Sequence, residues 1–338
     1  MPEARTISAE KPFSLKAFFL QWEWMLLTVF ILIQIVNSQL SPYYLDAENL
    51  VYTTTTFLDK AFIVLPMVFV IIMGEIDISV GSTVALSAVL MGMSNKAGLP
   101  MSLAMCVCLL VGLACGMFNG LILTRFKELA PMIVTLSTMI IYRGIALILL
   151  EDRAVGKFPS WFKEFGYGYL GPIPYMLAIF AAFAVLFGLL LHKTSFGRQV
   201  YAIGSNRTAS LFSGVPVDRI RFIVYALIGL MSGVTAIFLT AKMGSTRPNV
   251  AQGYELDVIA MTVLGGVSTA GGKGRMIGAV VSVFTVGYLR FGLGLRNVPA
   301  ENLLIVIGVL LIVAVMLPNI RTMIEGRLAK AENRRRAR

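Results

Sequence analysis

Long apolar stretches, separated by short polar segments, fill the chain from Trp22 to Pro318. An apolar helix of about 20 residues is long enough to cross the hydrocarbon core of a bilayer, so each such stretch predicts a membrane-spanning helix. The pattern therefore predicts an all-α, polytopic membrane protein of about ten transmembrane helices. The spans are expected at residues 18–38, 51–73, 77–95, 100–124, 130–150, 173–192, 220–242, 256–270, 276–296 and 302–318.

Composition supports the membrane assignment. The 338 residues are 57% hydrophobic and only 14% charged, and the mean hydropathy is +0.80. Ordinary soluble domains carry about 25% charged residues. We expect one integral membrane domain over residues 18–320, between an N-terminal tail (1–17) and a basic C-terminal tail (321–338).

The distribution of Lys and Arg predicts the topology. The net charge of +11 is concentrated in connecting segments and in the C-terminal tail, as in cytoplasmic loops of membrane proteins. Segment 193–221 holds five basic residues and one acid, whereas segment 151–172 has no positive excess. The first is expected inside and the second outside, with both termini cytoplasmic. The basic tail then meets lipid headgroups, and no nucleic-acid partner is expected.

The basic segment 193–219 is the clearest interruption of the apolar pattern. Its centre predicts a short helix capped by Ser205 or Asn206. Leu211 and Phe212 are apolar although the segment faces water, and an exposed apolar spot rimmed by charge indicates a docking surface. The residues expected to dock a cytoplasmic partner are Ser205, Asn206, Arg207, Thr208, Ala209, Ser210, Leu211, Phe212, Ser213 and Gly214.

A second unusual segment places the carboxylates Glu75 and Asp77 among apolar residues. A charge within the membrane is costly and marks a pathway or a paired site. Alternatively, Asp77 or Ser79 caps the start of the next helix. Both interpretations remain open, and Glu75, Asp77 and Ser79 are pathway or gate candidates.

A third segment, from Gly244 to Gly266, is rich in hydrogen-bonding groups suited to a polyhydroxylated solute. Its start is expected outside, where it forms either a mouth or gate or a solvated loop that contacts a docked protein. The pathway or gate candidates here are Asn249, Tyr254, Glu255 and Asp257. The short match between Glu75-Ile-Asp-Ile and Glu255-Leu-Asp-Val suggests the hypothesis of an inverted five-helix repeat.

The outer segment 151–172 is aromatic. Residues Trp161, Phe162, Phe165, Tyr167 and Tyr169 suit the headgroup level of a bilayer. The alternative is a short outer helix that receives a soluble partner.

No motif for chemistry on this chain emerges. Gly271-Gly-Lys-Gly-Arg275 lacks the Gly-Lys-Ser/Thr ending of a Walker A loop. The three cysteines lie in one apolar stretch and the single histidine, His192, lies beside Lys193. We therefore expect a transport subunit without catalytic residues, metal or cofactor, whose motor lies on another chain.

Four segments carry a resemblance to a known family: Gly74-Glu-Ile-Asp-Ile-Ser-Val-Gly-Ser82, Thr194-Ser-Phe-Gly-Arg-Gln-Val-Tyr-Ala-Ile-Gly-Ser-Asn206, Tyr254-Glu-Leu-Asp-Val-Ile-Ala260 and Val263-Leu-Gly-Gly266. They resemble the membrane permease subunits of bacterial sugar importers of the ATP-binding cassette class, the group with the ribose, xylose, arabinose, rhamnose and autoinducer-2 systems. The resemblance covers nearly the whole chain. Glu75 departs from it, because the family often has Gly there.

The resemblance implies an importer in the bacterial inner membrane. It would contain two permease subunits, identical or different, two cytoplasmic ATPases that bind ATP and Mg, and an extracytoplasmic sugar-binding protein. The helix near 205–214 would enter a groove on the ATPase. Two alternatives are a proton-coupled secondary sugar transporter, with Glu75, Asp77, Glu255 and Asp257 as proton carriers, and a membrane-embedded enzyme. Neither explains the apolar docking segment.

Overall fold

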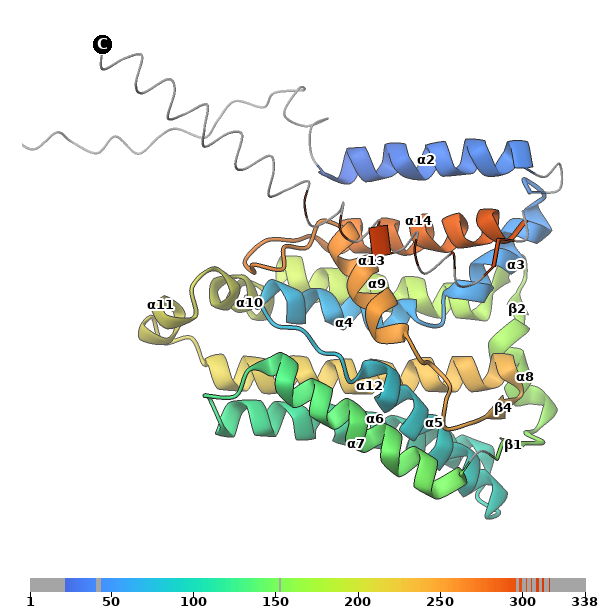
Figure 1. Ribbon diagram of the computed structural model, residues 1–338, viewed down its shortest axis with the longest axis horizontal. Helices are drawn as coiled ribbons and strands as arrows, with labels where there is room; N and C mark the ends of the chain where they lie inside the picture. The colour runs from blue at the N-terminus through green and yellow to red at the C-terminus, as the bar shows by residue number, and fades with distance from the viewer. Residues whose placement is uncertain are drawn as a thin grey trace, which may run out of the picture.

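The computed structural model describes residues 22–40, 44–151 and 153–295, with isolated positions between 298 and 316. Over this part the fold is almost entirely helical, which confirms the all-α prediction (Figure 1). The helices are α2 (Trp22–Leu40), α3 (Ala47–Phe57), α4 (Ala61–Ile72), α5 (Val80–Lys96), α6 (Met101–Arg125), α7 (Pro131–Leu150), α8 (Ser160–Tyr167), α9 (Tyr175–Lys193), α10 (Ser195–Ser205), α11 (Arg207–Phe212), α12 (Val217–Met243), α13 (Tyr254–Leu264) and α14 (Met276–Leu295).

Among the described residues, α6, α7, α9, α12 and α14 are long and apolar enough to cross a membrane. The pair α3 and α4, bent by 52° at a short break, makes a sixth candidate. The polytopic character is thus confirmed, while the number ten remains a prediction. The start of the 18–38 span, most of the 302–318 span and both predicted tails lie outside the described residues.

The predicted span at 256–270 is wrong in extent. Helix α13 ends at Leu264 and has 11 residues, so it is about 16 Å long, roughly half of the hydrocarbon thickness. The chain turns at Gly265 and Gly266, and Gly266 has a φ of +85°. A Cβ on Gly265 would lie 2.5 Å from the Cα of Ala279, so the chain passes directly against α14.

Helix α4 forms the centre of the bundle. All residues from Ala61 to Ile72 are buried. A helix that is apolar on every side is surrounded by protein or lipid, and here α9, α12, α13 and α14 pack around it. The Phe62 ring stacks on Phe238 of α12 with 4.9 Å between centroids.

Helices α6 and α12 approach each other backbone to backbone. A Cβ on Gly116 would lie 2.2 Å from the carbonyl oxygen of Tyr225, and one on Gly229 would lie 2.3 Å from that of Gly112. Small residues at such spacing let membrane helices pack closely. The pair forms a rigid wall beside α4 and α5.

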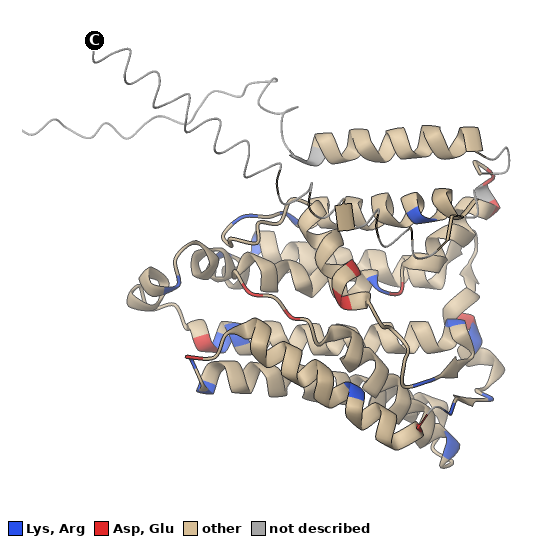
Figure 2. Ribbon diagram, in the orientation of Figure 1, with Lys and Arg blue, Asp and Glu red and all other residues tan. Residues whose placement is uncertain are grey.

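The two ends of the bundle differ. Helices α10 and α11 and the turn 270–275 lie at one end, here called the coupling end; α8 and the strand pairs lie at the other, here called the far end (Figure 1). The strands are β1 (Val155–Gly156) with β4 (Ser245–Thr246), and β2 (Tyr169–Leu170) with β3 (Ile173–Pro174). Charged residues gather at both ends, and a few lie inside the bundle (Figure 2).

The aromatic outer segment contains the short helix that one of the two interpretations expected. Helix α8 buries Phe162 and leaves Trp161 and Tyr167 exposed at the far end. That α8 receives a soluble partner remains a prediction.

Candidate solute pathway and coupling site

The coupling segment forms two short helices outside the long bundle helices. The Thr194 hydroxyl accepts a hydrogen bond from the Gly197 amide at the start of α10. The Asn206 side chain accepts one from the Ala209 amide, 2.9 Å away, at the start of α11. Asn206 is thus the cap, which confirms one of the two predicted capping residues.

Helix α11 is short because Gly214 ends it. Gly214 adopts a φ of +79°, and its amide donates to the Leu211 carbonyl oxygen. Pro216 then precedes the first residue of α12. This αL ending is typical of helix C-termini and fixes the angle between α11 and α12.

Helix α11 lies at the coupling end, outside the long helices of the bundle (Figure 1). The Phe212 side chain is 86% exposed and Leu211 is 56% exposed, whereas Ser210 is buried. Placement of Phe212 at the tip of a protruding helix fits a docking surface. The structure does not contain the partner, so the docking role of residues 205–214 remains a prediction.

Helix α10 joins this tip to the centre of the bundle. A Cβ on Gly204 would lie 1.7 Å from the carbonyl oxygen of Ile72, the last residue of α4. The Gly272 amide donates to the same oxygen over 2.8 Å. Three segments therefore meet at one backbone junction: the end of α10, the end of α4 and the turn 270–275.

Tyr201 reinforces this junction from the middle of α10. Its hydroxyl donates to the Gly274 carbonyl oxygen over 2.6 Å. Burial raises the pKa of Tyr201, so the hydroxyl stays protonated and remains a donor at neutral pH. Tyr201 thus ties the middle of α10 to the turn that leads into α14.

Glu75 lies in the extended segment between α4 and α5, just beyond the junction. Its carboxylate pairs with Arg221 of α12, with 2.8 Å between Oε1 and Nε, and accepts a hydrogen bond from the Tyr225 hydroxyl. Arg221 also donates to the Leu123 carbonyl oxygen. Both charged side chains are nearly inaccessible to solvent. The charge that departs from the family pattern is thus neutralised within the chain.

Asp77 and Ser79 belong to a second buried network. The Asp77 Oδ1 atom accepts hydrogen bonds from the amide and the hydroxyl of Ser79. Asn119 donates to the Ser79 hydroxyl, and Tyr142 donates to Asn119. Both candidates are about 1% exposed, and the Ser79 side chain makes no cap bond to an amide of α5. The roles of Asp77 and Ser79, as capping or as pathway residues, remain predictions.

Tyr254 and Asp257 of α13 point toward the break between α3 and α4. Asp257 pairs with Lys60 over 2.6 Å and also with Arg290 of α14. The Tyr254 hydroxyl donates to Asp59 over 2.7 Å, and Lys242 pairs with the same carboxylate. This ion network joins α13 to the bend of the α3–α4 span and engages both candidates in internal bonds.

Glu255 points elsewhere, into a cavity of about 400 Å³ beside α7. A Cβ on Gly81 would lie 2.4 Å from Glu255 Oε2, so α5 approaches this carboxylate closely. Arg143 of α7 lines the same cavity and donates to the carbonyl oxygens of Pro248 and Val250. Asn249 is exposed in the loop held by these two bonds.

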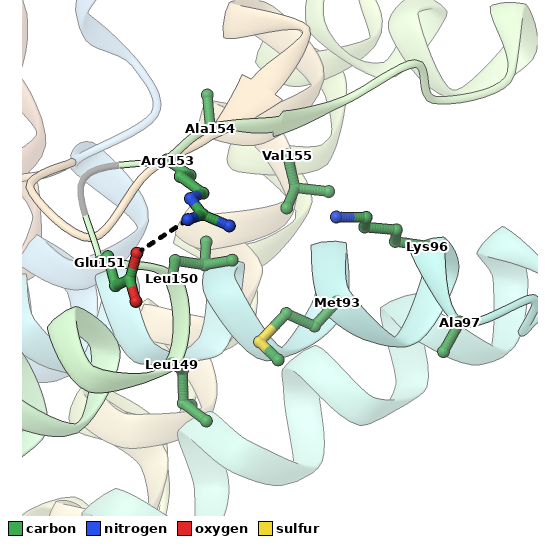
Figure 3. A pocket seen from close by; sticks show the side chains of 9 residues that line it. All are labelled: Met93, Lys96, Ala97, Leu149, Leu150, Glu151, Arg153, Ala154 and Val155. Atoms are coloured by element: carbon green, nitrogen blue, oxygen red, sulfur yellow. Dashed lines mark ion pairs between the residues drawn. The ribbon is translucent and has the colours of Figure 1, made fainter.

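Another cavity, of about 450 Å³, lies at the far end between α5 and α7 (Figure 3). Its ion pair joins Arg153 to Glu151 over 3.3 Å, and both side chains are largely exposed. Exposed pairs contribute little stability. This cavity is part of the outer surface and not of the bundle interior.

The predicted site residues therefore separate into three groups. Residues 205–214 form the protruding coupling tip. The candidates engaged only in internal bonds are Glu75, Asp77, Ser79, Tyr254 and Asp257. Glu255 accepts one internal bond and also lines a cavity, and Asn249 is exposed. Sequence reasoning missed the basic partners. Isolated charges within apolar stretches were the available signal, and they occur at Lys60, Arg143, Arg221 and Arg290.

Comparison with known proteins decides the family. Residues 49–315 match the family described as the branched-chain amino acid transport system / permease component. The chain belongs to this permease family. The match covers every helix from α4 to α14, including the coupling tip and the ion network around Asp257.

Curated relatives of this permease match along most of their length. It is 34% identical to the autoinducer 2 import system permease protein LsrD of Klebsiella pneumoniae over 303 residues, which cover 88% of this chain and 91% of the relative. It is 39% identical to the ribose import permease protein RbsC of Bacillus subtilis over 295 residues, covering 86% and 90%. No solved structure matches significantly.

Proposed function

We propose that this permease is the membrane subunit of an ATP-driven importer of the ATP-binding cassette class, and that it passes a sugar or sugar-like solute into the cytoplasm. Relatives named for import of ribose and of autoinducer 2 support this solute class. Ribose, rhamnose and related pentoses or deoxyhexoses, and autoinducer 2, are the candidates. The solute arrives from an extracytoplasmic binding protein at the far end.

The observation that carries the proposal is the path from Phe212 to Ile72. An exposed aromatic side chain at the tip of α11 continues, through α10, into a backbone contact at Gly204 that leaves no room for a Cβ. Interdigitated backbones transmit displacement because they cannot be compressed. A protein that grips the tip therefore moves the end of α4 and the segment with Glu75.

The likeness to import permeases and the exposed tip of α11 support the partners that we propose. A cytoplasmic ATPase, which holds ATP and Mg, binds each α11, and two permease subunits, identical or different, together form one pathway. ATP binding closes the ATPase pair and favours one of two permease conformations by differential affinity. The subunit lies in the bacterial inner membrane with both termini in the cytoplasm.

Uptake by reconstituted vesicles tests the function. The permease is co-reconstituted with its ATPase and binding protein, and uptake of labelled ribose is measured with ATP inside the vesicles or with an imposed proton gradient. We expect uptake with ATP and none with the gradient alone. Uptake driven by the gradient in the absence of ATP would contradict the proposal and favour a secondary transporter.

A further inference from the structure

The cavity beside α7 is lined by polar residues at a depth where α7 crosses the membrane interior. Arg143 lies seven residues before the end of α7 at Leu150, which places it about 10 Å below the far end of the helix. Arg143 and Glu255 are partly exposed, and Gln252 is exposed. A guanidinium and a carboxylate at that depth are costly against lipid hydrocarbon, so this face meets water or protein.

The cavity combines polar groups with apolar walls. Its polar lining consists of Ser82 of α5, Arg143 of α7 and the pair Gln252 and Glu255 before and within α13. The rest of the lining comes from α7 and includes Ile140 and Leu147, and Ile140 is 63% exposed. A volume of about 400 Å³ with few polar groups on an apolar lining lies within the range of small-molecule sites.

The hydrogen-bonding groups are only partly used inside the chain. Glu255 accepts one bond, from the Gly253 amide over 3.2 Å. The Nη1 atom of Arg143 donates to two backbone carbonyl oxygens. Within the described residues, the Nε and Nη2 atoms of Arg143 have no hydrogen-bond partner. A carboxylate accepts from two adjacent hydroxyls, while a guanidinium and an amide donate to oxygens.

We infer that this cavity is a solute-contact site on the wall of the pathway, and that its ligand is an uncharged, polyhydroxylated molecule the size of a monosaccharide. Glu255 accepts from neighbouring hydroxyls, Arg143 and Gln252 donate to hydroxyl or ring oxygens, and Ile140 and Leu147 pack against the carbon skeleton. This inference rests on the proposed function, because the cavity lines a pathway only if the second permease subunit covers the α7 face.

Cysteine accessibility first tests the site with all of its polar groups in place. Ile140→Cys is made in a Cys106→Ser background, because Cys106 is exposed, whereas Cys108 and Cys115 are buried. The matched control is Leu189→Cys on α9, which is 53% exposed but packs with α4 and α14 on another side of the bundle. Both variants are treated in native membranes with a charged methanethiosulfonate.

Reaction at position 140 is expected to be at least about tenfold faster than at position 189, because thiolates form in water and not in hydrocarbon. Millimolar ribose, xylose or rhamnose is expected to slow the reaction, and leucine, which has no hydroxyls, is not. Adding Glu255→Gln should abolish the sugar protection while leaving the reaction itself fast. A purely structural Glu255 would leave protection unchanged.

Equal, slow reaction at positions 140 and 189 would contradict the inference that the cavity is a solute-contact site. Protection by leucine and by none of the sugars would overturn the ligand class. The same membranes are examined for a co-purifying ATPase: slow labelling with the ATPase present contradicts only this inference, whereas absence of the ATPase contradicts the proposed function.

Discussion

Arg221 neutralises Glu75 across 146 residues of sequence, and the pair joins α12 to the extended segment between α4 and α5. Both side chains are almost completely buried. The segment with Glu75 is therefore held to α12 on one side and, at Ile72, to Gly204 of α10 on the other. We regard this segment as the part of the bundle that responds to the coupling tip.

Removing one member of this pair should destabilise the permease strongly. In Glu75→Gly the Arg221 charge stays buried without its carboxylate, and breaking a buried pair in this way costs about 3–5 kcal/mol. Replacing both residues, as in Glu75→Gly with Arg221→Met, should recover most of that loss. Thermal unfolding in detergent, followed by loss of monodisperse protein, measures the difference.

The double variant is the control, because the Glu75–Arg221 pair is the one interaction that both changes remove, although Glu75 also accepts a hydrogen bond from Tyr225 of α12. Additive losses in the double variant would show that Glu75 and Arg221 stabilise the fold independently. That result would remove the pair from the account of coupling.

A methyl group at position 204 should disturb the junction between α10 and α4. The Cβ of Gly204→Ala would lie 1.7 Å from the Ile72 carbonyl oxygen, so one of the two backbones must move. We expect ATP-driven uptake to fall about tenfold, the change that results when a typical coupling free energy is lost. The ATPase should still bind. The matched control is Gly294→Ala in α14, where a Cβ meets nothing within 4 Å. Unchanged uptake by Gly204→Ala would contradict a role of the α10–α4 junction in transport.

The Asp257 network predicts a different outcome. Asp257→Asn leaves Lys60 and Arg290 facing each other without their shared carboxylate. We expect a loss of stability of about 3 kcal/mol or more. Adding Lys60→Met should partly restore it, and thermal unfolding of the single and double variants checks this. An Asp257→Asn protein that is as stable as the parent and retains uptake would contradict a structural role.

The hydropathy pattern predicts most of the fold, because long apolar helices are dictated by the membrane itself. It fails at α13, where the apolar composition continues through residue 270 but the backbone turns at Gly265 against Ala279. Hydropathy counts side chains and does not detect a backbone that must turn to fit a neighbouring helix.

The coupling tip was predictable because its signals are local. The Asn206 cap, the Gly214 ending and the apolar Phe212 all lie within ten residues. The ion networks were not, since Lys60 and Asp257 are 197 residues apart and nothing local indicates which acid pairs with which base. The hypothesis of an inverted repeat remains untested, and superposition of the two halves on the segments with Glu75 and Glu255 would decide it.

The central claim is that α11 holds the ATPase, and affinity purification from native membranes tests it most directly. The parent permease is compared with Phe212→Asp and with Leu170→Asp, which places the same charge at an exposed leucine of the far end. We expect a stoichiometric ATPase with the parent and with Leu170→Asp, and little or none with Phe212→Asp, although all three are inserted equally. Equal recovery of the ATPase with Phe212→Asp, or its absence from all three, would contradict the account.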